Sequence, residues 1–449
     1  MDYNGLPNGY ERLSVSPAEN SIYDSGGNVA ITEQSNNIGS FTEVKIQELK
    51  WLEHDGTHSH FNSLVQVDTN TYAMAYSGSG WDGYLATFDI PTHGGSITEV
   101  ASVEHYTANG KNNSLCKVDA DTYVLAFSDN SNDGIIKTFT ISASGAITTG
   151  VQLEHDVSHN WFNSLIQLDA DTYVLAYTGS GDDGYIKTFT IPANGGSITQ
   201  VASLEHDVLQ GYYNSLVKVD ANTVALAYSS SSDQGYIKTF TIPADGSSIT
   251  QVASYRHDSI QGKYNSFVQA DSDTYVLAYS GSGNDGFIKT FTIPADGSSI
   301  TQVKKVEHDN VFGQYNSLVK ISGGSDSYLL AYGGPDTQGG SAYDGFIKTF
   351  SIPLDGSTIT ETYELEYSTT QGEYNSLVQM DENSFALAEA GGSDDGYIIT
   401  FDVRGSDQVP PTFTSVTLAN NNATVVVNLD EFVFNTASGS GSLEASDFA

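Results

Sequence analysis

The sequence is poor in cysteine and in basic residues. Its single cysteine, Cys116, excludes a disulfide within the chain and occupies a position where other copies of a repeated segment carry valine or isoleucine, so we expect a small core residue. Seventeen lysine and arginine residues stand against 55 aspartate and glutamate residues, which gives a net charge of −38. Such a surface repels phosphate backbones and anionic lipid headgroups. Nucleic acid is therefore not expected as a partner.

Arginine and long apolar runs are also scarce. The three arginines, Arg12, Arg256 and Arg404, lie far apart in the sequence, which excludes a sialidase-like site where several arginines bind one carboxylate. No apolar segment approaches the ~20 residues of a membrane helix, so no membrane insertion is expected. The first residues lack the pattern of a secretion signal. We expect that a signal has been removed or that the chain is exported by another route, for example inside a virion.

The chain does contain a phrase that returns seven times. Each copy has Asn-Ser followed by an apolar segment, an aspartate, a tyrosine-rich segment, a Gly-containing turn and a Phe-rich segment. The asparagines of this phrase are Asn62, Asn113, Asn163, Asn214, Asn265, Asn316 and Asn375. A period near fifty residues with several short strands per repeat is typical of a β-propeller blade.

Each repeat predicts four antiparallel strands. In the third repeat we expect them at 163–169, 172–178, 185–191 and 197–205, with proline and glycine confined to the turns. Along the second strand Tyr173, Leu175 and Tyr177 point one way and Val174 and Ala176 the other, which gives a bulky face and a slim face. We expect the bulky face of one blade to pack on the slim face of the next.

The two ends of the repeat region predict a closed ring. The last repeat supplies three strands before Arg404, and residues 39–44 and 52–55 match the fourth-strand segments 196–201 and 204–207. The fold class is therefore predicted as all-β: a closed seven-bladed β-propeller of four-stranded antiparallel blades, with the last blade completed by the N-terminal strand.

The predicted domain boundaries are a polar leader at 1–38, the propeller at 39–404, a linker at 405–411 and a separate module at 412–449. The last segment predicts strands at 414–418, 424–429 and 441–448 and resembles the opening strands of bacterial immunoglobulin-like modules. It covers less than half of such a β-sandwich. We expect a monomeric domain within a longer chain.

The repeated segments Asn-Ser-Leu-Val-Gln-Val-Asp, Thr-Tyr-Val-Leu-Ala-Tyr and Asp-Gly-Tyr-Ile-Lys-Thr-Phe-Thr-Ile resemble tandem propeller repeats of large bacterial, often marine, exoproteins. This resemblance implies export, an extracellular or cell-surface location, and adhesion or matrix contact. It carries no catalytic signature and names no ligand.

Variable residues at one rim are the predicted binding site. Connections from the fourth strand to the next first strand share this rim with the turns between strands two and three, and aromatic and imidazole groups gather there. Aromatic faces beside carboxylates and amides suit sugar rings or extended peptides. The candidates are Trp161, His159, Trp81, Tyr212, Phe312, His58 and His60. Alternatively, these rings pack the rim and shield the blade ends. The insertion at 333–344 in the sixth repeat is a second candidate binding element or a tolerated surface loop.

Two segments could hold a metal ion. Asp129, Ser131 and Asp133 have the oxygen spacing of a calcium loop, although a turn capped by its own side chains is the alternative. His58 and His60, together with His54, could trap a transition metal. Apart from calcium, no cofactor is expected. The histidine that ends the fourth strand in six repeats is expected to form a structural hydrogen bond within its blade.

These observations predict an extracellular recognition or adhesion module that binds a glycan, another surface polymer or a protein partner through its rim loops, without catalysis. One alternative is a carbohydrate-active lyase or hydrolase that uses rim carboxylates. A second alternative is a passive structural spacer or virion decoration.

Overall fold

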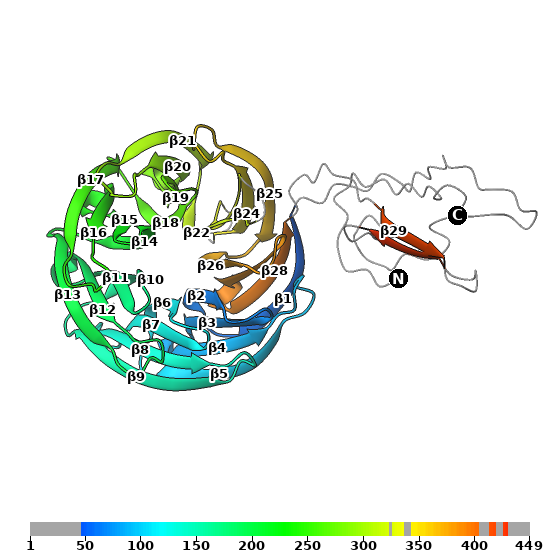
Figure 1. The fold of residues 1–449 in the computed structure, drawn as a ribbon, viewed down its shortest axis with the longest axis horizontal. Coiled ribbons are helices and arrows are strands. Elements are labelled where there is room, and N and C mark those ends of the chain that lie inside the picture. The colour runs from blue at the N-terminus through cyan, green and yellow to red at the C-terminus, as the bar shows by residue number, and fades with distance from the viewer. Residues whose placement is uncertain (1–45, 323–325, 336–342, 404–412, 419–424, 430–449) are drawn as a thin grey trace, which may run out of the picture. The chain divides into compact units, whose positions relative to one another are not determined.

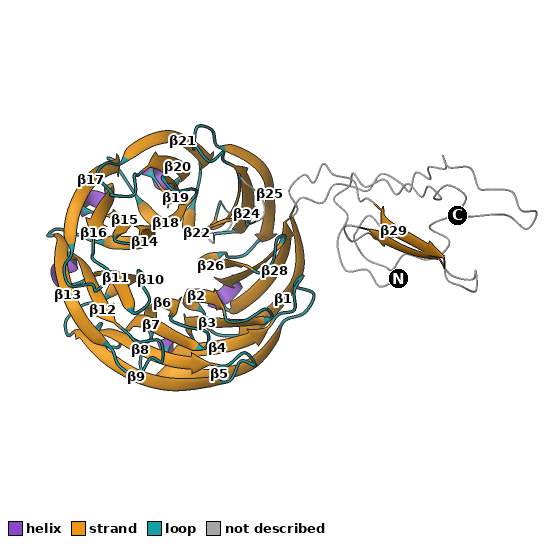
Figure 2. Ribbon diagram, viewed as in Figure 1, coloured by secondary structure: helices purple, strands orange, loops and turns teal. Residues whose placement is uncertain are grey.

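The computed structural model describes residues 46–322, 326–335, 343–403, 413–418 and 425–429. Within Glu48–Phe401, which forms one compact unit, four-stranded antiparallel sheets surround a central axis as seven blades (Figures 1 and 2). The predicted all-β, seven-bladed propeller is thus confirmed. No helix in the described part of the chain is long and apolar enough to cross a membrane.

The strands follow the chain order around the ring. The first three blades consist of β2 (His60–Gln66), β3 (Thr71–Ser77), β4 (Gly83–Asp89) and β5 (Thr98–Tyr106); β6 (Lys111–Lys117), β7 (Thr122–Ser128), β8 (Gly134–Ile141) and β9 (Ile147–Asp156); and β10 (Trp161–Gln167), β11 (Thr172–Thr178), β12 (Gly184–Thr190) and β13 (Thr199–Asp207). The next three consist of β14 (Tyr212–Asp220), β15 (Thr223–Ser229), β16 (Gly235–Thr241) and β17 (Thr250–Asp258); β18 (Lys263–Gln269), β19 (Thr274–Ser280), β20 (Gly286–Thr292) and β21 (Thr301–Asp309); and β22 (Gln314–Lys320), β23 (Ser327–Gly333), β24 (Gly345–Ser351) and β25 (Thr360–Ser368). The seventh blade consists of β26 (Glu373–Gln379), β27 (Ser384–Ala390), β28 (Gly396–Val403) and β1 (Ile46–Asp55).

The third blade shows how closely the repeat pattern predicted the strands. Its second strand, β11, has the predicted bounds, and the other three lie within two residues of theirs. Single-turn 3-10 segments, such as η2 (Ser180–Asp182), form the predicted turns between strands two and three. The first strand begins earlier than expected because Trp161 pairs with Thr178 before the register shifts at residues 162–163.

The blades pack as the alternation of large and small residues predicts. Tyr173, Leu175 and Tyr177 share one buried cluster with Val124 and Ala126 of the preceding blade. The slim face of the same strand packs in the next cluster, toward the fourth blade. Burial of one such large side chain stabilises the fold by roughly 1.5–3 kcal/mol. Each blade therefore depends on its neighbours for the burial of both faces.

The seventh blade closes the ring with strands from both ends of the repeat region. β1 forms its outer strand, in the order β1-β28-β27-β26. Leu52 packs against the cluster that contains Met380 and Ile398, and the Thr400 hydroxyl donates a hydrogen bond to the carbonyl of Lys50 at 3.3 Å. The expected completion of the last blade by the N-terminal strand is confirmed. Residues 39–45 of the matching segment lie outside the described residues.

The C-terminal segment contributes two further strands, described by themselves. β29 (Phe413–Leu418) and β30 (Val425–Leu429) pair antiparallel, close to the first two strands expected there. The third expected strand, 441–448, the leader at 1–38 and the linker at 405–411 lie outside the described residues. The immunoglobulin-like module remains a prediction.

Candidate functional site

The expected rim is built by hydrogen bonds between its loops and turns. The amide of Gly110, in the loop from the first to the second blade, donates to the carbonyl of Trp81 at 2.8 Å. Gly211 and Asp182 repeat this bond at 2.9 Å, between the third and fourth blades. The connections between blades and the turns within blades thus share one rim, as predicted.

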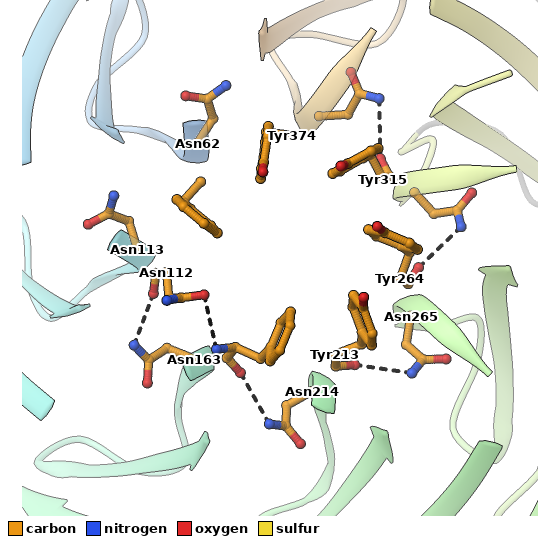
Figure 3. Close-up of a pocket in the computed structure, with 14 residues that line it drawn as sticks. Asn62, Asn112, Asn113, Asn163, Tyr213, Asn214, Tyr264, Asn265, Tyr315 and Tyr374 are labelled. Atoms are coloured by element: carbon orange, nitrogen blue, oxygen red, sulfur yellow. Dashed lines mark hydrogen bonds between the residues drawn. The ribbon is translucent and has the colours of Figure 1, made fainter. Parts of the chain in front are cut away.

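A cavity of about 190 Å³ opens at the centre of the ring. Two adjacent residues from the start of each first strand surround it, and Figure 3 shows their side chains arranged around the opening. One residue of each pair is the asparagine of the repeated phrase. The residues preceding these asparagines are Phe61, Asn112, Phe162, Tyr213, Tyr264, Tyr315 and Tyr374.

All seven preceding residues have left-handed backbone conformations. Their φ angles lie between 51° and 55°, at the register shift where each first strand begins. For residues other than glycine this conformation costs roughly 1–2 kcal/mol. The adjacent asparagine secures it: Asn214 Nδ2 donates to the carbonyl of Phe162 at 3.2 Å and to that of Gly211 at 2.9 Å. The asparagine thus ties the first strand to the preceding blade, as expected of a residue that every blade shares.

The aromatic side chains form an arc that is open at Asn112. Ring centroids of neighbours lie 4.4 Å apart for Phe162 and Tyr213 and 4.6 Å apart for Tyr213 and Tyr264. Similar contacts continue through Tyr315 and Tyr374, which lie 4.8 Å apart. The tyrosines of the arc also carry hydroxyl groups. The cavity mouth therefore combines aromatic faces with hydroxyl groups.

The sequence analysis missed this arc. An aromatic residue precedes the phrase asparagine in six of the seven repeats, so the signal was present. Residues that recur in every blade are typical of the scaffold, which is why this signal alone does not predict a site. Seven equivalent positions meet around the axis of a closed ring, so repetition itself builds the arc.

The predicted rim residues contact one another and the arc. Trp161 donates from Nε1 to Asn132 Oδ1 at 3.3 Å, and its ring lies 4.5 Å from that of His159. Tyr212 lies 5.2 Å from Phe162 of the arc. Phe312 instead packs on Tyr343, at 4.7 Å. Most of the insertion at 333–344 lies outside the described residues.

Trp81, His58 and His60 gather at the junction of the seventh and first blades. Trp81 is 37% exposed, and its ring lies 4.1 Å from that of His58 and 5.1 Å from that of His60. His60 also stacks on Tyr374 of the arc at 4.2 Å. His54, expected to complete a histidine cluster, instead packs edge-on against Tyr76 at 4.8 Å. The structure thus separates His54 from the other two histidines.

Acidic groups at this junction have contrasting environments. Burial raises the pKa of Glu373, although the neighbouring Tyr315 acts to lower it. Burial also acts to raise the pKa of Asp394, but the hydrogen bond from Gln371 and the nearby His60 outweigh it and leave that pKa lowered. Burial lowers the pKa of His60 to about 4, so its imidazole is neutral near pH 7.

The turn that resembles a calcium loop is closed by its own hydrogen bonds. Oδ1 of Asp129 accepts from the amides of Ser131 and Asp133 at 2.8 and 2.9 Å. Oδ2 of Asp129 accepts from the Tyr106 hydroxyl at 3.0 Å. These bonds match the self-capped turn named as the alternative. Calcium binding here remains a prediction.

The repeated fourth-strand histidines differ from their expected role. The ring nitrogens of His105, His206, His257 and His308 have no protein hydrogen-bond partner. Each ring instead lies edge-on to an aromatic ring of the next blade, as His206 does to Tyr228 at 4.8 Å. The expected hydrogen bond within the blade is therefore wrong for these four. Their rings pack against the glycine that begins the third strand, where no side chain would fit.

Comparisons with known proteins identify the fold only. No protein-family model matches the sequence, and no curated protein matches it. The structure is similar to the periplasmic gluconolactonase of Pseudomonas aeruginosa, with a TM-score of 0.54 and 13% identity over 77% of this chain and 91% of that one. A putative 6-phosphogluconolactonase from Bacteroides fragilis gives 0.53 and 13%, over 68% and 84%. The WD40 domain of Toxoplasma gondii coronin gives 0.51 and 10%, over 82% and 92%. At such identities the likeness shows the β-propeller fold, which hosts unrelated activities.

Proposed function

We propose that this protein is an extracellular recognition module that binds a glycan or a similar hydroxyl-rich surface polymer at the rim around the central cavity. The observation that carries the proposal is the aromatic arc at the cavity mouth. Aromatic faces stack on the apolar faces of sugar rings, and hydroxyl and amide groups orient the sugar hydroxyls. Tyr213, Tyr264 and Tyr315 supply hydroxyls, whereas the Asn112 amide in the gap is held by Ser128 and by the backbone amide of Phe162.

The dimensions of the site favour binding of a polymer end or a single projecting unit. The cavity of about 190 Å³ is smaller than the roughly 300–1,000 Å³ of typical small-molecule sites. Further contacts would come from rim side chains outside the cavity, notably Trp161 and Trp81. Because these side chains lie near the arc, one ligand could contact the rim and the arc together.

A panel of polysaccharides and glycans tests this proposal with the full chain. We expect binding of at least one hydroxyl-rich polymer, weakened by Trp161→Ala and by Tyr315→Phe, which removes one hydroxyl while keeping the ring. Trp51→Ala is the matched control because Trp51 is 55% exposed but lies on the outer strand β1. The absence of binding across the panel, or an equal loss in Trp51→Ala, would contradict the proposal.

A carbohydrate-active hydrolase is the second candidate function. Glu373 and Asp394 are its candidate carboxyl groups, because their pKa values are shifted in opposite directions and glycoside hydrolysis assigns different roles to two carboxyl groups. In this case the chain should release products from a polysaccharide, and Glu373→Gln should abolish the release while binding persists. Lack of product release across an acidic and neutral polysaccharide panel would exclude this alternative. A passive spacer would show neither binding nor turnover.

A further inference from the structure

Two histidines and one aspartate meet where the ring of blades closes. His58 and His60 lie between β1 and the start of β2, and Asp394 lies in the turn between β27 and β28. One ring nitrogen of each histidine and one carboxylate oxygen lie within 4.8 Å of one another. We propose that these three side chains form a binding site for a divalent transition metal, with zinc as the best-matched ion.

The nitrogens of this group are buried and short of partners. His60 is 7% exposed, and neither of its ring nitrogens has a hydrogen-bond partner. Its Nε2 lies 3.3 Å from Oδ1 of Asp394. Nε2 of His58 is also buried without a partner. Leaving a buried polar group unsatisfied costs roughly 1–3 kcal/mol. A metal ion would bind one nitrogen of each imidazole and one oxygen of Asp394, and would thereby satisfy one buried nitrogen of each histidine.

The donor set determines the kind of ion. Two imidazoles and one carboxylate match the ligands of open zinc sites, whereas calcium and magnesium prefer oxygen donors alone. Metal–ligand distances of about 2.0–2.2 Å would place tetrahedral ligand atoms roughly 3.4 Å apart. A pair at the full 4.8 Å would therefore have to approach by roughly 1.4 Å, which rotations of the side chains can provide.

Neighbouring side chains already orient the proposed ligands. Gln371 Nε2 donates to Oδ1 of Asp394 at 2.9 Å. The Trp81 ring lies against His58, and Tyr374 stacks on His60. Hydrogen bonds and packing around ligands of this kind raise the affinity of metal sites because they hold the ligands in place.

At another junction of the ring, a lysine supplies the positive charge that the closing junction lacks. At the position equivalent to His60, between the fourth and fifth blades, Lys263 pairs with Asp233 at 2.8 Å. At the closing junction an imidazole replaces that lysine, and a second imidazole lies beside it at a centroid distance of 3.9 Å. A divalent cation would supply the missing positive charge. Lys111 also lies near these histidines, but its amine packs over the Trp81 ring at 4.3 Å.

Zinc titration of the full chain tests the site. After removal of metal with EDTA, we expect calorimetry to show one zinc ion per chain and the melting temperature to rise by about 2–4 °C in excess zinc, because the metal binds the folded state. Cobalt should bind at the same site and give the visible absorption of a nitrogen- and oxygen-ligated ion. His60→Gln and Asp394→Asn should each weaken zinc binding by at least about tenfold.

His159→Gln is the matched control. His159 lies 3.5 Å from Asp182 at a different junction, where the position equivalent to His60 is Trp161, so its loss should leave zinc binding unchanged. His58→Gln, at a less buried position, repeats the test if the His60 variant does not fold. The absence of zinc uptake by the unmodified chain would overturn the proposal. Unchanged uptake in both Asp394→Asn and His58→Gln would also overturn it.

Discussion

Glu389 is a buried carboxyl group at the junction of the sixth and seventh blades. It occupies the position of Tyr332 one blade earlier and lies beside Tyr367, which stands where six other blades carry a histidine. The Tyr367 hydroxyl donates to Oδ1 of Asn375 at 3.0 Å. Ile399 likewise replaces the lysine that other junctions use, such as Lys348, whose amine donates to the carbonyl of His308 at 2.8 Å. Three neighbouring positions thus differ together from the other blades. Glu389 and Tyr367 fill the space that Tyr332 and His308 fill one blade earlier.

This replacement makes stability depend on pH. Burial raises the pKa of Glu389 to about 8, from 4.5. The folded chain therefore holds a proton that the unfolded chain loses between about pH 4.5 and 8, so the free energy of unfolding should fall as pH rises through this range. Urea unfolding at pH 5–8 should show a slope up to about 1.4 kcal/mol per pH unit steeper for the unmodified chain than for Glu389→Gln.

The exposed turn residue Glu382 supplies the control for this measurement. Glu382→Gln also removes one carboxyl group but from a solvated position, so its pH profile should follow that of the unmodified chain. Parallel profiles for the unmodified chain and Glu389→Gln would show that Glu389 is ionised in the folded protein.

At the scale of elements, β1 should matter more to stability than any part of the chain beyond residue 408. Removal of residues 1–55 exposes the edge of β28 and uncovers the cluster on which Leu52 packs. Calorimetry should show a loss of many degrees, or no cooperative transition, because an open ring leaves one sheet edge and one apolar face in water. Removal of residues 409–449 should leave the main transition within about 2 °C, since the compact unit ends before them. Equal melting temperatures for the two truncations would contradict closure by β1.

The sequence predicted strands better than it predicted the site, for a physical reason. Strands such as β11 follow from alternation between neighbouring residues, so local pattern and turn residues suffice. The aromatic arc depends instead on a left-handed backbone conformation at the start of each first strand. Residues with large aromatic side chains rarely adopt this conformation. The meeting of His60 with Asp394 depends on closure of the ring, which joins segments from opposite ends of the repeat region. Neither arrangement is visible in a local pattern.

At the scale of the whole molecule, several of the few lysines are buried beside carboxylates and do not offset the charge of the exposed acidic residues. Lysines in four neighbouring junctions are at most 9% exposed and donate to backbone carbonyls of the preceding blade. These are Lys187, Lys238, Lys289 and Lys348. They contribute little to neutralising the remaining carboxylates, so the folded chain concentrates negative charge on its exterior.

Self-repulsion of this exterior predicts that salt stabilises the protein. The Debye length falls from about 30 Å at 0.01 M to about 8 Å at 0.15 M ionic strength, so added sodium chloride should screen surface carboxylates while the buried lysine contacts are screened much less. The melting temperature, measured by calorimetry with EDTA present, should therefore rise over this range. Choline chloride at equal ionic strength should give the same shift, because screening does not depend on the identity of the cation. A flat or falling melting temperature in both salts would show that the net charge of −38 does not destabilise the closed ring.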